Sequence, residues 1–238
     1  MANAVFPYMR HCALLALIVG CTSATADTPK PEPPPAKRFE RDMMARFHMH
    51  QNFDLVRAIE RLLIRGKLDE AKKFAEAIAM APDEPAHGPW AQQTQIVRDR
   101  AMAVARATTV DDALRKDTLL AAACGDCHRD HYGSAMFENP PAIPPDKPTI
   151  DARMARHRWA ADRLWEAIVG DADDAWREGL DVLAAAPLQL DPDRTRYAKD
   201  LQKLALAARR AKPPVTARAA TYGDILVTCA GCHTRRTP

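Results

Sequence analysis

The chain has 238 residues, of which 47% are apolar and 6% aromatic, and its formal net charge at pH 7 is +3. This length and apolar content suffice for one large domain or two small ones. Because the charges nearly balance, the chain has no long-range electrostatic attraction for nucleic acid, and we exclude that class of function.

The first 26 residues are typical of an export signal, in which Arg10 precedes a short apolar core at 12–20. Two cleavage sites compete. The small-x-small sequence at 24–26 favours release of a soluble protein, whereas 18–21 resembles a bacterial lipobox, in which Cys21 carries the lipid. Beyond this segment, no apolar run approaches the length of a membrane-spanning helix.

A proline-rich segment follows at 27–40, and its composition predicts a semi-extended tether. Lipoproteins often carry such a tether after the lipidated cysteine, so we favour lipidation at Cys21. Either cleavage route exports the chain.

Four helical segments are predicted within 41–132 from apolar residues spaced by three and four positions. Gly66 and Pro82 mark the ends of the first two segments. The predicted helices are 41–65, 67–81, 90–107 and 111–131.

Residues 133–149 contain five prolines, which predict a linker or strap between two units. Four more helical segments follow within 150–238, where Gly170 and Pro187 end the first two. They are predicted at 151–169, 172–185, 192–211 and 216–235. No strand pattern is evident, and four short helices per half favour an up-down-up-down bundle.

The two halves resemble each other at a constant offset of 105 residues. The positions that match are Met49 with Met154, Pro82 with Pro187, Val110 with Val215, and Cys124 with Cys229. A constant offset along the whole unit indicates an internal duplication. The predicted fold class is therefore all-α, with two tandem four-helix-bundle domains at 41–132 and 150–238.

Each half ends in the sequence Cys-x-x-Cys-His. Two thiols three positions apart, with an imidazole directly after the second, form the arrangement that attaches c-type haem. The thiols bond to the haem vinyl groups, and the histidine is the proximal iron ligand. We therefore predict two covalently attached haem c groups and no disulfide. The motif residues are Cys124, Cys127 and His128 in the first half, and Cys229, Cys232 and His233 in the second.

Three other interpretations of these cysteines agree less well with the sequence than haem attachment does. A thioredoxin-like motif should follow a strand, whereas these motifs end helical patterns. A zinc site would need all four thiolates together, but the two pairs lie 105 residues apart in similar settings. A disulfide framework suits short chains with little core.

The second axial ligand of each iron is expected near the start of the first helix of its half. In an up-down-up-down bundle that start lies level with the end of the fourth helix. In the second half His157 lies on the inward stripe, with Met154 one turn earlier as the alternative. Ligation by His157 and His233 would leave no open iron position. The competing interpretation is a partly exposed histidine between Arg156 and Arg158.

In the first half, the position equivalent to His157 is Asn52, which is a poor iron ligand. His48 and Met49 are the candidates there, and the sequence does not decide between them. His50 falls on the polar face of the helix, where it is expected to be solvated. A vacant iron position is the third option.

A haem motif at the end of the fourth helix, with His or Met early in the first, resembles the class II cytochromes c (cytochrome c prime and relatives). The resemblance covers each half separately and implies a four-helix bundle around each haem. It also makes gas binding at an open iron position credible. Asn52 departs from the expected histidine.

These features predict an exported di-haem cytochrome that transfers electrons between redox protein partners in the periplasm or membrane, where it could be held by the lipid on Cys21. With no convincing acid–base pair, we expect an electron carrier rather than an enzyme. One alternative is a haem protein whose first iron is open and binds a small gas or peroxide. Another is a subunit of a larger respiratory complex. The covalent linkage predicts haems close enough for fast transfer between them.

Overall fold

The computed structural model describes residues 35–82, 90–131, 137, 140–185, 190–209 and 213–234, and every regular element in them is a helix. The all-α prediction is confirmed. The predicted export signal and the tether up to residue 34 lie outside the described residues. The helices are α1 (Pro35–Ile64), α2 (Leu68–Ala79), α3 (Ala91–Ala105), α4 (Val110–His131), α5 (Ile150–Val169), α6 (Asp173–Leu183), α7 (Pro192–Ala208) and α8 (Val215–Thr234).

The helix bounds agree with the prediction to within a few residues except at the start of α1. That helix begins at Pro35, so residues 35–40 are helical where an extended tether was predicted. Proline suits the first turn of a helix because its missing N–H would have no partner there, and good helix formers follow it. Among the described helices, none is long and apolar enough to cross a membrane.

The turns that follow α1 and α5 have the same backbone conformation. Gly66 and Asp171 are the two described residues with positive φ, at 74° and 51°, and they lie 105 positions apart. Glycine adopts this conformation without strain, whereas Asp171 is held in it by Arg218, whose Nη1 lies 3.3 Å from the carboxylate. Gly170, which was predicted to end the helix, is the C-cap of α5 with an ordinary φ of −98°.

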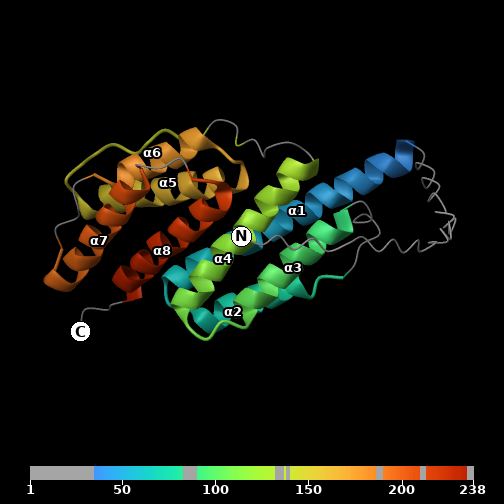
Figure 1. Cartoon of the computed structure of the whole chain (residues 1–238), viewed down its shortest axis with the longest axis horizontal. Coiled ribbons are helices and arrows are strands. Elements are labelled where there is room, and N and C mark those ends of the chain that lie inside the picture. The colour runs from blue at the N-terminus through green and yellow to red at the C-terminus, as the bar shows by residue number, and fades with distance from the viewer. Residues whose placement is uncertain are drawn as a thin grey trace, which may run out of the picture.

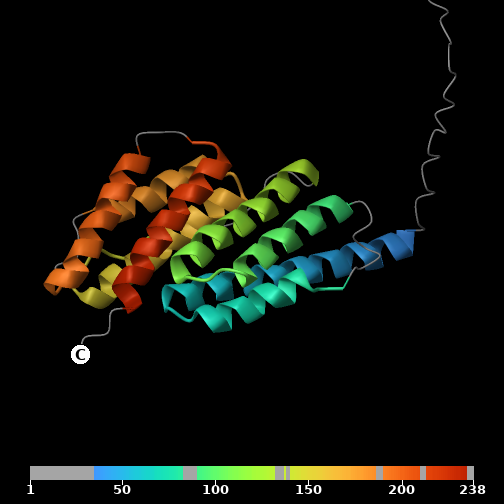
Figure 2. The ribbon, with the colours of Figure 1, turned by 60° about the horizontal axis from the view of Figure 1, so that its bottom comes forward.

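Helices α4 and α8 lie side by side in the middle of the molecule and run in opposite directions (Figures 1 and 2). Their backbones approach closely at Gly223, where a Cβ atom would lie 3.1 Å from the hydroxyl of Thr118. Arg115 pairs with Asp224 at 2.9 Å across the same contact. Helices α2 and α3 lie on one side of this central pair, and α6 and α7 lie on the other (Figure 1).

The two halves share one hydrophobic core, because the buried apolar residues of α1, α4, α5 and α8 form a single cluster. Helices α1 and α5 also meet directly. Phe53 packs edge-on against Trp165 with the ring centroids 4.8 Å apart, and Arg57 forms an ion pair with Asp162. The halves are therefore joined through their first and fourth helices.

A polar cluster is buried where the halves meet. Arg57 Nη1 lies 3.0 Å from a Glu60 carboxylate oxygen, and the Tyr222 hydroxyl lies 3.1 Å from the other. Asp117 is 1% exposed, and its Oδ1 has no hydrogen-bond partner among the described residues. Burial raises the pKa of Asp117 well above its usual value, with the Glu60 carboxylate adding to the effect.

Asp117→Asn should stabilise the protein at pH 8, by about 1–3 kcal/mol, because a buried carboxylate without full partners is costly. Folding raises the pKa of Asp117, so the native state binds more protons than the unfolded state above the usual pKa. Wild-type stability therefore falls as pH rises through that window. In urea unfolding, the advantage of the variant should be larger at pH 8 than at pH 5. An equal advantage at both pH values would contradict a raised native pKa.

Candidate haem sites

Both Cys-x-x-Cys-His sequences lie in the last turns of a continuous helix, α4 in the first half and α8 in the second. In a helix the first cysteine, the second cysteine and the histidine are at positions i, i+3 and i+4, so they share one face. All four cysteines are half-buried. His128 is half-buried, and His233 is exposed. Each helix end can thus present two thiols and an imidazole to one group.

The thiols do not have the character of redox-active cysteines. Burial, with the neighbouring cysteine of each motif adding to it, raises the pKa of Cys124 and of Cys229 to about 12. Reactive cysteines in redox enzymes have lowered pKa values instead. Within the described ranges, no group of three or more His, Cys, Asp or Glu side chains could hold a metal ion, so a four-thiolate zinc site is not formed.

A glycine inside each motif packs closely against a neighbouring helix. A Cβ atom added to Gly125 would lie 2.6 Å from the carbonyl oxygen of Ile168 in α5. One added to Gly231 would lie 2.4 Å from the ring of Tyr197 in α7. Glycine at these positions permits the close approach, and this packing fixes which way each motif faces.

At the second site, the candidate iron ligand His157 comes near His233 of the motif. His157, in the second turn of α5, interacts electrostatically with His233. Burial above all, and then His233, Arg153 and Arg156, lower the pKa of His157 to about 4. Its imidazole is therefore neutral at pH 7, which is the form that binds a metal. Met154 is half-buried one turn earlier and stays the alternative.

At the first site, burial favours His48 over Met49. His48 is half-buried and its Nε2 atom is shielded from solvent, whereas Met49 is 37% exposed. His50 is exposed, as predicted for the polar face. Asn52, at the position equivalent to His157, is half-buried. Burial lowers the pKa of His128, which favours the neutral form of this proximal candidate.

The helix that carries His48 exposes large apolar side chains along its first half. They lie on two faces of the helix, and exposed apolar side chains of this size are typical of a binding surface. The porphyrin of a haem is a large apolar surface that could cover those beside His48, so the residues fit the predicted group. The exposed side chains are Met43, Met44, Phe47, Met49 and Phe53.

The two motifs lie at opposite ends of the central helix pair, because α4 and α8 are antiparallel (Figure 2). Thr118 of α4 and Gly223 of α8 are in contact. Cys127 lies nine residues beyond Thr118, and Cys232 lies nine residues beyond Gly223, in the opposite direction. At about 1.5 Å of rise per residue the motifs are on the order of 25 Å apart. The expectation that covalent linkage brings the haems close together stays a prediction.

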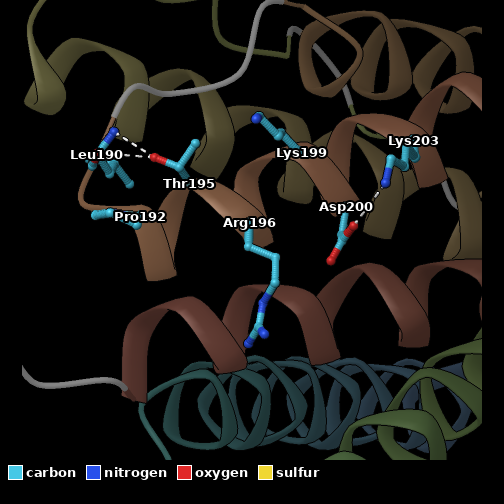
Figure 3. A pocket seen from close by; sticks show the side chains of 7 residues that line it. All are labelled: Leu190, Pro192, Thr195, Arg196, Lys199, Asp200 and Lys203. Carbon is cyan, nitrogen blue, oxygen red and sulfur yellow. Dashed lines mark hydrogen bonds and ion pairs between the residues drawn. The ribbon is translucent and has the colours of Figure 1, made fainter.

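Surface hollows are found in the second half of the chain. The larger, of about 490 Å³, lies along α7 and carries Arg196, Lys199 and Lys203, with Asp200 paired to Lys203 at 3.4 Å (Figure 3). A smaller one, of about 50 Å³, is the one that includes His157. Its other lining residues are Asp146, Arg153, Arg156, Val182 and Ala185.

Two arginines beside the second motif were given no role in the sequence interpretation. Arg194, in the first turn of α7, and Arg65, directly after α1, both lower the pKa of His233. Nothing in the sequence distinguishes Arg194 from the many other charged residues of α7. Arg65 comes from the other half of the chain, so its place depends on how the halves pack.

No family model matches the chain, and no curated protein or solved structure is significantly similar to it. The resemblance to class II cytochromes c therefore rests on the motif residues and the helix order alone.

Proposed function

We propose that this protein is an exported di-haem c-type cytochrome that carries out electron transfer. One observation carries the proposal: each Cys-x-x-Cys-His sequence presents two cysteines and a histidine on one helix face, with a neutral His157 beside His233 in the second site. A bound haem supplies an iron that changes between the ferric and ferrous states, and the protein sets its potential.

The residues of each site have distinct tasks in this proposal. In the first site Cys124 and Cys127 hold the haem covalently, His128 binds the iron, and His48 binds it from the other side. In the second site the cysteines are Cys229 and Cys232, and the iron ligands are His233 and His157. A pair of imidazole ligands leaves no iron position for a substrate, which suits an electron carrier.

We also propose that the two halves are tandem four-helix bundles that arose by duplication. The helices support this, since α1 and α5 end 105 residues apart, as do the starts of α4 and α8. Arg57 and Asp162 are equivalent positions of the two halves and pair with each other. Equivalent residues meet in this way where two similar units pack about a twofold axis.

The proposed location is the periplasm, with the chain either released after residue 26 or anchored through a lipid on Cys21. Both Cys21 and the cleavage position after residue 26 lie outside the described residues. In that compartment its partners would be redox proteins of the periplasm or membrane.

The haem content tests the attachment sites. The protein produced with its haem-attachment machinery should contain two haems per chain in the pyridine haemochrome assay. Cys124→Ala/Cys127→Ala and Cys229→Ala/Cys232→Ala should each contain one, because thioether bonds at one motif do not depend on the other. Wild-type protein with no covalent haem would contradict the proposal.

Carbon monoxide tests the axial ligands. The ferrous spectrum of the wild type should not change with carbon monoxide, because two imidazoles occupy each iron. In His48→Ala and in His157→Ala about half of the haem absorption should shift, since each removes one ligand. A wild-type spectrum that shifts by half would favour the alternative function, gas or peroxide binding at an iron left open opposite Asn52.

A further inference from the structure

Four arginines surround the second haem site. They come from three parts of the chain that only the fold brings together: the turn after α1, the start of α5 and the start of α7. Two of them act electrostatically on His233 and the other two on His157. This arginine cluster consists of Arg65, Arg153, Arg156 and Arg194.

The packing places these arginines independently of any electrostatic argument. Arg153 and Arg156 line the same small hollow as His157. Arg194 lies one turn before Tyr197, whose ring is against Gly231 inside the motif. Arg65 precedes Gly66, and a Cβ atom on Gly66 would lie 2.7 Å from the side chain of Thr234, the residue after His233.

The first site has a different electrostatic environment. Carboxylates act on its cysteines, Asp117 and Asp126 on Cys124, and Asp130 on Cys127. At the second site Glu60 acts on Cys229, and both Arg194 and Asp191 act on Cys232. The repeat also lacks counterparts for the arginines. His48, Gln51 and Pro89 stand 105 positions before Arg153, Arg156 and Arg194.

Carboxylates offset part of the positive charge at the second site, where Glu60 acts on Cys229 and two others lie beside the arginines. Asp146 lines the hollow with His157, and Asp191 lies 3.5 Å from Arg194. The four arginines still outnumber them, and a guanidinium stays charged at every relevant pH. Two haem propionates could pair with arginines there, since a guanidinium binds a carboxylate with two parallel hydrogen bonds.

We propose that the arginine cluster makes the second site the electron-accepting end of the molecule, by raising the reduction potential of a haem bound there above that of the other. The inference rests on the proposed function. Reduction adds one electron and no bond to the chain is made or broken, so nearby positive charge favours the reduced state. In the protein that has taken up one electron from a donor, the electron therefore rests at the second site.

Redox titration of the haem-loaded, full-length protein tests this. The wild type should titrate in two one-electron steps. In Arg153→Gln/Arg194→Gln the step at higher potential should fall by about tenfold in its equilibrium constant, which is about 59 mV for one electron. The other step should not move. Arg177→Gln is the matched control, because this 65% exposed side chain pairs with Asp174 and does not line the hollow that includes His157.

Two further variants separate charge from structure. Arg153→Lys/Arg194→Lys keeps the charge and should keep the wild-type potentials. Arg65→Gln changes an exposed residue, so this variant should fold normally. It should lower the potential of the higher-potential step by less than the double glutamine variant does. Unchanged potentials in the glutamine variants would overturn the proposal, as would a fall in the lower-potential step or an equal fall in the lysine variant.

The haem count separates this proposal from the one on which it rests. A wild-type chain with fewer than two haems contradicts the proposed function before any titration. If the chain carries two haems but their reduction potentials do not change in the arginine variants, the result contradicts the arginine proposal alone.

Discussion

The antiparallel contact between α4 and α8 is the constraint on which the rest of the structure depends. It forms because Gly223 lets the two backbones approach, with Thr118 filling the space that a side chain would take. Since both motifs end these two helices, the contact sends them to opposite ends of the molecule. It also brings each motif against the other half: Gly125 meets the end of α5, and Thr234 meets the turn after α1.

The buried polar cluster joins the halves in a way that a purely apolar contact would not. Glu60 belongs to the first half, and its partner Tyr222 belongs to the second. Apart, each half would leave one of these groups without its partner, and an unsatisfied buried polar group is unfavourable. Polar partners also disfavour other ways of pairing the same apolar helix faces, because few alternatives satisfy both groups.

The helices and the motifs could be predicted because their signals are local. Glycine, proline and helical spacing fix where α2 or α6 begins and ends, and the haem motif lies within five residues. The packing of one half on the other could not be predicted, since it depends on contacts such as Phe53 with Trp165. The same limit hid the place of Arg65 and the placement of the two motifs at opposite ends of the central helix pair.

Under the proposed duplication, the two halves can be compared position by position. The turns at Gly66 and Asp171 keep one backbone conformation although the residues differ. At the candidate iron ligand the repeats differ in chemistry, with His157 in one and Asn52 in the other. Two haem sites with identical surroundings would have equal potentials and give an electron no preferred end. Divergence around the motifs, on a retained scaffold, is therefore the simplest way for a duplicated haem unit to acquire a direction.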